Sequence, residues 1–74
     1  MPKLPVISGK NTIKKLEKLG YIVVRKKGSH VRLHHNSDLK LKPITIPLHK
    51  NLKFGLLHYI LKDANLTIEE FIQL

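Results

Sequence analysis

The chain lacks cysteine and tryptophan, and acidic side chains are scarce, with 5 Asp and Glu against 14 Lys and Arg. Without cysteine the chain can form no disulfide and no thiolate metal site. No apolar run approaches the roughly 20 residues of a membrane-spanning helix. The start, Met1-Pro2-Lys3-Leu4-Pro5, lacks the apolar stretch of a signal peptide. We therefore expect a cytoplasmic protein that does not contact a membrane.

Several kinds of catalytic motif are also missing. There is no glycine-rich phosphate loop, no Ser/His/Asp set and no pair of carboxylates. The histidines are poorly spaced for a metal, because His30 and His34 would lie about 13 Å apart along a strand, whereas zinc binds each nitrogen at about 2.0–2.1 Å. His34 and His35 would point to opposite faces of that strand. We expect neither a metal site nor a cofactor.

The 74 residues predict one small domain, covering residues 1–74, and its charge is unevenly distributed. A core of this size contributes only about 3–5 kcal/mol to the stability of the fold. We therefore do not expect the chain to tolerate a large internal pocket or a buried cofactor. Residues 1–50 carry a net charge of +10, whereas residues 51–74 carry −1. This imbalance favours a polyanionic partner such as RNA. The alternative is a basic protein without such a partner.

The first predicted helix begins after Ser8, a good N-cap, and runs to about Leu19. Gly20 follows as the residue able to take positive φ at the helix end. An inward apolar stripe is formed by Ile13, Leu16 and Leu19. An outer row at i, i+4 spacing is formed by Lys10, Lys14 and Lys18. This row is either a solvated face or a set of phosphate contacts, which add salt-dependent affinity without sequence recognition.

Three strands are predicted next, over residues 21–26, 29–35 and 44–46. A tight turn at Lys27-Gly28 would pair Val24 with Val31 and Ile22 with Leu33, placing all four apolar side chains on one buried face. The same register would place Arg25 opposite His30. It would also place Tyr21 opposite His34 on the open face, where its ring could stack on a base.

The remaining chain predicts two further helices. An apolar face recurs at helical spacing between residues 52 and 64, and Asn65 is a plausible left-handed stop. Thr67 and Glu70 form a capping box for a last short helix, whose buried side would hold Ile68, Phe71 and Ile72. The order α-β-β-β-α-α predicts an α+β fold, with a three-stranded antiparallel sheet covered by helices on one face only.

His30 is the first candidate for chemistry, because the hairpin places it on the open face beside Arg25 and Arg32. A neutral imidazole near pH 7 can take a proton from a hydroxyl and return one to a leaving group. RNA carries its own nucleophile in the 2′-OH, so a base and positive charge suffice without a metal. Arg25 and Arg32 would stabilise the charge that develops on the phosphate. The alternative is an ordinary surface histidine.

Several segments of this sequence resemble the HicA (YcfA-like) family of bacterial toxins. In the first half these are Pro5-Val6-Ile7-Ser8-Gly9-Lys10, Leu16-Glu17-Lys18-Leu19-Gly20-Tyr21 and Arg25-Lys26-Lys27-Gly28-Ser29-His30. In the second half they are Ile46-Pro47-Leu48-His49, Gly55-Leu56-Leu57, Ile60-Leu61-Lys62-Asp63-Ala64 and Glu69-Glu70-Phe71. The resemblance covers nearly the whole chain in the right order. Many members have a second histidine directly after the first, where this chain has Val31.

The resemblance implies a fold similar to the double-stranded-RNA-binding domain. It also implies a ribonuclease that cleaves messenger RNA and stops translation, and a HicB-type antitoxin that covers the active face. The family's catalytic histidine follows Gly-Ser, which corresponds to His30. Besides the two arginines, we expect RNA contacts from Lys10, Lys14, Lys26, Lys27 and Ser29. The alternatives are a non-catalytic RNA-binding module of the same fold and a small protein-interaction domain.

Overall fold

The computed structural model describes residues 3–74. Met1 and Pro2, which belong to the stretch that we expect not to be a signal peptide, lie outside the described residues. The elements follow one another as α1 (Gly9–Glu17), β1 (Tyr21–Lys27), β2 (His30–His35), β3 (Ile44–Pro47), α2 (Phe54–Asp63) and α3 (Ile68–Gln73). This is the expected order.

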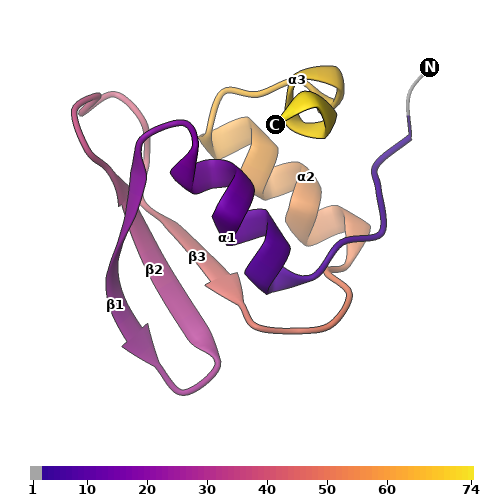
Figure 1. Cartoon of the computed structure of the whole chain (residues 1–74), viewed down its shortest axis with the longest axis horizontal. Coiled ribbons are helices and arrows are strands. Elements are labelled where there is room, and N and C mark those ends of the chain that lie inside the picture. Colours follow the sequence, from indigo (N-terminus) through magenta and orange to yellow (C-terminus); the bar gives the residue numbers. More distant parts are fainter. Residues whose placement is uncertain (1–2) are drawn as a thin grey trace.

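The three strands form one antiparallel sheet in the order β1-β2-β3. Figure 1 shows α1 and α2 packed on the same side of this sheet, with α3 folded back over the helices. The α+β fold class, similar to the double-stranded-RNA-binding domain, is thereby confirmed. Among residues 3–74, no helix covers the opposite face of the sheet, which we call the open face (Figure 1).

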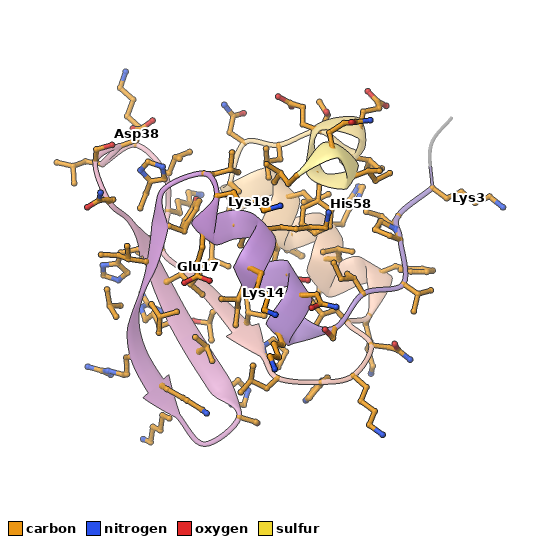
Figure 2. The ribbon with its side chains drawn as sticks, viewed as in Figure 1. Lys3, Lys14, Glu17, Lys18, Asp38 and His58 are labelled. Atoms are coloured by element: carbon orange, nitrogen blue, oxygen red, sulfur yellow. The ribbon has the colours of Figure 1, made fainter. Side chains whose placement is uncertain are left out.

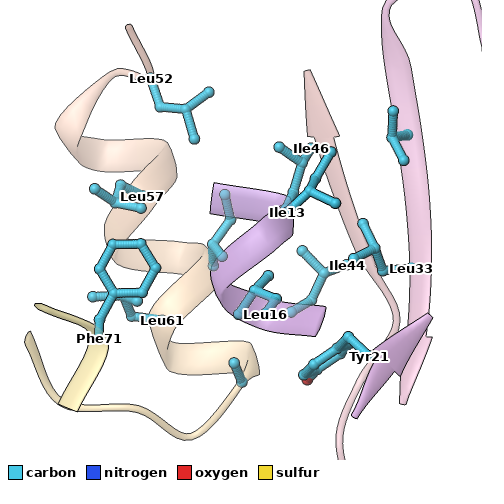
Figure 3. Close-up of a cluster of buried hydrophobic side chains, with 13 residues drawn as sticks. Ile13, Leu16, Tyr21, Leu33, Ile44, Ile46, Leu52, Leu57, Leu61 and Phe71 are labelled. Atoms are coloured by element: carbon cyan, nitrogen blue, oxygen red, sulfur yellow. The ribbon is translucent and has the colours of Figure 1, made fainter. Parts of the chain in front are cut away.

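The core lies between the sheet and the helices and draws on every element (Figure 3). Its buried side chains are Ile13, Leu16, Tyr21, Val31, Leu33, Ile44, Ile46, Leu52, Leu57, Ile60, Leu61, Ala64 and Phe71. Because β2 and β3 contribute alternate residues to this core, the residues between them face outward. Val31, which replaces the second family histidine, is thus an internal packing residue.

The ends of α1 follow the local sequence rules. The Ser8 hydroxyl accepts a hydrogen bond from the Asn11 amide at 3.0 Å, as expected of an N-cap. The helix ends at Glu17, two residues earlier than predicted. Leu19 and Gly20 donate instead to carbonyls three residues back, which tightens the last turn. Gly20 has φ +101°, so the predicted left-handed position is confirmed.

The predicted hairpin register is wrong. The two residues at its tip are Gly28 and Ser29, and Lys27 pairs with His30. Gly28 has φ +58°, which suits the first central position of a type II′ turn, where glycine is favoured. A turn centred one residue earlier would not place the glycine there. Arg25 therefore lies opposite Arg32, not opposite His30.

A β-bulge at Val24 changes the register again further along β1. Val23 pairs with Leu33 and Arg25 with Arg32, so Val24 is the additional residue. Ile22 and Val24 are each 47% exposed, so their predicted burial is also wrong. The reason is that β1 is an edge strand, and the helices cover only its first residue.

Tyr21 is that first residue, and it is 1% exposed. It pairs with His35 on the helix side of the sheet, and the two rings meet edge to face with centroids 5.1 Å apart. The prediction of a base-stacking tyrosine on the open face is therefore wrong. The phenol oxygen has no hydrogen-bond partner. Burial, followed by the negative charges of Asp63 and Asp38, raises the pKa of Tyr21.

The C-terminal helices agree with the sequence in most respects. α2 is shorter at both ends than the predicted segment, and Asn65 has the expected positive φ of 57°. Thr67 and Glu70 form the predicted capping box, with bonds of 3.1 and 2.9 Å. Those bonds from Thr67 lower the pKa of the Glu70 carboxyl. Phe71 is buried, but Ile72 is 44% exposed, contrary to prediction.

Among residues 3–74, no helix combines the length and apolar character required to cross a membrane.

Candidate functional site

The open face of the sheet carries two adjacent rows of residues. In the first row Lys27, His30 and Pro47 lie side by side across the three strands. In the second row Arg25 and Arg32 are paired, with Thr45 beyond them. Directly opposite residues have Cβ atoms about 4.5–5.5 Å apart. His30 is therefore next to a lysine across the hairpin and close to a pair of arginines along the face.

His30 is exposed, and its place on the open face follows from β2 alone. Val31 and Leu33 are 4% and 0% exposed, so His30 and Arg32, which alternate with them along the strand, must point the other way. The prediction that His30 faces outward is thus confirmed. Its neighbour across the hairpin is Lys27, where the sequence suggested Arg25.

The bulge at Val24 determines which basic residues of β1 reach this face. With the register of Tyr21 to Val23 continued, Arg25 would pair with Val31 on the helix side. The additional residue shifts the strand by one position, so that Arg25 and Lys27 join His30 and Arg32. The bulge at Val24 therefore places Arg25 and Lys27 on the same face of the sheet as the exposed His30.

Arg25 and Arg32 form a like-charged pair directly across two strands, an arrangement that destabilises the free sheet. Arg32 is oriented by a bond from Nη1 to the Thr45 hydroxyl at 3.3 Å. A phosphate bound between the guanidinium groups would relieve the repulsion and accept hydrogen bonds from both. The row is thus chemically suited to an anion.

At its hairpin end this face joins the start of α1 through backbone contacts. The Leu48 amide donates to the Ser29 carbonyl at 2.7 Å. The Gly9 amide donates to the His49 carbonyl at 2.9 Å. Gly9 is also packed tightly against the Pro47 carbonyl, because a Cβ at this position would lie only 1.9 Å from that oxygen. We call these contacts between residues 9, 29, 47, 48 and 49 the junction.

Not all of the predicted RNA contacts lie beside His30. Lys26 pairs with Val31 and so belongs to the helix side of the hairpin, although it is exposed beyond the helices. Lys10 and Lys14 are exposed on α1, and Figure 2 shows Lys14 and Lys18 projecting from that helix. Because α1 covers the other side of the sheet, the lysine row is separated from the open face. Ser29 lies at the hairpin tip, next to His30.

The structure also gives roles to residues that sequence reasoning passed over. The Lys15 ammonium donates to the Phe71 and Leu74 carbonyls at 3.3 and 2.8 Å, and lies 5.4 Å from the centre of the Phe71 ring. It therefore holds α3 and is not part of the solvated lysine row. The His35 Nε2 donates a hydrogen bond to the Leu19 carbonyl at 2.7 Å, while Nδ1 of the same ring accepts one from the Asp38 amide at 2.9 Å. Neither long-range contact leaves a signal in the sequence.

Within residues 3–74 no group of three or more His, Cys, Asp or Glu side chains is placed to hold a metal ion.

Comparison with known proteins agrees with this architecture. The model of a family described as HicA toxin of bacterial toxin–antitoxin systems matches residues 9–66, from the first residue of α1 to the loop after α2. The match spans well over half of the chain and includes the whole sheet and the junction. No curated protein matches. The family assigns the chain a toxin role and an antitoxin partner. This chain belongs to the HicA family of bacterial toxins.

Proposed function

We propose that this toxin is an endoribonuclease that cleaves messenger RNA without a metal ion, and that His30 is its general base. The observation that carries the proposal is the exposed His30 on an open sheet face, with Lys27 directly across the hairpin and Arg25 and Arg32 in the adjacent row. This arrangement combines a proton acceptor with positive charge at one accessible place.

In the proposed reaction the His30 imidazole takes the proton of a ribose 2′-OH. The 2′-oxygen attacks the adjacent phosphorus, the new O–P bond forms, and the bond from phosphorus to the 5′-oxygen breaks. The products are a 2′,3′-cyclic phosphate and a 5′-hydroxyl. Arg25 and Arg32 stabilise the negative charge that accumulates on the phosphate oxygens, and Lys27 adds a further cation.

The remaining predicted contacts are proposed to bind the RNA backbone on either side of the cleaved bond. Ser29 lies at the hairpin tip, Lys26 pairs with Val31 on the helix side close to that tip, and Lys10 follows Gly9 of the junction in the chain. Lys14 extends the basic surface along α1. Such contacts carry no sequence information, and they weaken as the salt concentration rises, because the release of counterions from the RNA on binding then becomes less favourable.

An acidic, HicB-like antitoxin is the proposed protein partner. The net charge of +9 at pH 7 favours an acidic surface, and a partner on the open face would bury His30 and exclude RNA. Purified complex with the protein encoded by the neighbouring gene should show no cleavage. It should also protect His30 from diethyl pyrocarbonate, and a complex with His30 fully reactive would contradict this occlusion.

The cleavage itself is tested with purified wild-type protein and an RNA transcript. We expect discrete products from the wild type and a rate about 10²–10⁴-fold lower for His30→Ala. His58→Ala is the matched control, because His58 is exposed on α2, away from the open face. EDTA should leave the rate unchanged. RNA binding without products from any of the three proteins would favour the non-catalytic RNA-binding module.

A further inference from the structure

The proposed reaction needs two proton transfers on opposite sides of the phosphorus. In an in-line displacement the attacking 2′-oxygen and the leaving 5′-oxygen are roughly collinear with phosphorus. An imidazole placed to deprotonate the first cannot reach the second in the same step. The arginines do not give up a proton in proteins, so they cannot supply the acid. The 5′-oxygen therefore takes its proton from a second group of the protein or from water.

Three of the other histidines are unsuitable for this task. His34 lies about 13 Å along β2 from His30. His35 is held between the Leu19 carbonyl and the amides of the following turn. His58 is on α2, in the helix layer on the far side of the sheet (Figure 2).

His49 is the remaining histidine, and the junction brings it to the hairpin end of the open face. Pro47 lies directly opposite His30, with Cα atoms about 4.5–5.5 Å apart in an antiparallel pair. His49 follows two residues later, so its Cα is within about 7 Å of that of Pro47. The two imidazoles therefore start from β2 and from the loop directly after β3, at the same end of the sheet.

The backbone at His49 is also fixed more firmly than that of an ordinary loop. On one side the Leu48 amide is bonded to the Ser29 carbonyl, the residue before His30. On the other side the His49 carbonyl accepts from the Gly9 amide at the start of α1. The imidazole itself is exposed and free to meet a ligand. A catalytic group needs this combination of a positioned backbone and an accessible side chain.

We propose that His49 is the general acid that donates a proton to the 5′-oxygen as the P–O5′ bond breaks. The proton balance is then complete, because His30 gains the 2′-OH proton and His49 loses one to the leaving group. This inference rests on the proposed ribonuclease activity and adds a second catalytic residue to it.

The test uses a leaving group that does not need an acid. The cleavage site of the wild type is first mapped on an RNA oligonucleotide. The same oligonucleotide is then made with sulfur in place of the bridging 5′-oxygen at that site, because a thiolate leaves without protonation. His49→Gln should cleave the normal RNA about 10²–10⁴-fold more slowly than the wild type. On the sulfur-containing RNA it should come within about tenfold of the wild type.

His30→Gln is the matched comparison, since a lost base is not rescued by a better leaving group. It should be slow on both RNAs, and His58→Gln should match the wild type on both. If His49→Gln cleaves normal RNA as fast as the wild type, or is equally slow on both RNAs, His49 is not the acid. If the wild type cleaves neither RNA, the proposed function itself fails. Circular dichroism of each variant shows whether it is folded.

Discussion

The contact between Gly9 and Pro47 gives the sharpest prediction about stability. A methyl group on Gly9 would lie 1.9 Å from the Pro47 carbonyl oxygen, 3.0 Å from its carbon and 3.2 Å from the Leu48 Cα. All three are backbone atoms, so no side chain can rotate away. Gly9→Ala must therefore move the start of α1 away from the end of β3.

The cost can be worked out from three contributions. Overpacking of this kind typically destabilises by about 1–3 kcal/mol. Loss of the bond from the Gly9 amide to the His49 carbonyl adds about 1 kcal/mol. The better helix propensity of alanine returns up to about 1 kcal/mol. We expect a net loss of about 2 kcal/mol, out of the roughly 3–5 kcal/mol available to a domain of this size.

Urea unfolding followed by circular dichroism measures this loss as a lower midpoint. In a thermal scan it corresponds to about 8–16 °C. Gly55→Ala is the matched control, because Gly55 is in the first turn of α2 with no atom within 4 Å of an added Cβ. That change should stabilise by a few tenths to about 1 kcal/mol. If Gly9→Ala were as stable as Gly55→Ala, the close approach at the junction would be refuted.

Three further substitutions test other contacts. Lys15→Met should destabilise by about 1–2 kcal/mol, because the charged bonds to the end of α3 are lost, whereas Lys14→Met should stay within about 0.5 kcal/mol of the wild type in urea unfolding. Tyr21→Phe should unfold at the same or a higher urea concentration, since the buried hydroxyl has no partner; a clear loss of stability would reveal one. Because burial raises the pKa of Tyr21 above 10.0, the wild type should also lose stability at pH values above 10 in a way that Tyr21→Phe does not. The pKa of Glu70 is lowered, so its contribution to the free energy of unfolding is complete above the ordinary value of 4.5 and is lost as the pH falls below it. The difference in stability between the wild type and Glu70→Ala should therefore disappear in acid. A difference independent of pH would contradict the capping role.

The sequence predicted best those features that depend on a few neighbouring residues. The Ser8 cap, the positive φ of Gly20 and Asn65, and the Thr67 capping box are all set by contacts within four positions. The outward direction of His30 was equally predictable, because Val31 alternates with it within one strand. These features survived although the hairpin register was wrong.

The register could not be deduced because β1 does not alternate. Ile22, Val23 and Val24 are three consecutive β-branched residues, so either phase of the strand looks equally apolar. The phase is fixed instead by the glycine at the turn and by how little of β1 the helices cover. The covering of β1 depends on the assembled fold, as does the approach of His49 to the hairpin, whereas a two-residue turn at Gly28-Ser29 is a signal that the sequence does contain.

The additional residue in β1 has a consequence for how this protein tolerates changes in length. Deleting Val24 would leave the turn, the core and the far end of the hairpin as they are. Val23 would then directly precede Arg25, as Arg32 directly precedes Leu33 on β2, so every remaining pair between β1 and β2 would be kept and Tyr21 would stay buried. A shortening by this one amino acid would thus remove the irregularity while both the half of the strand that builds the fold and the half that carries the guanidinium group keep their faces, whereas losing a paired residue of β1 would shift its neighbours to the opposite face.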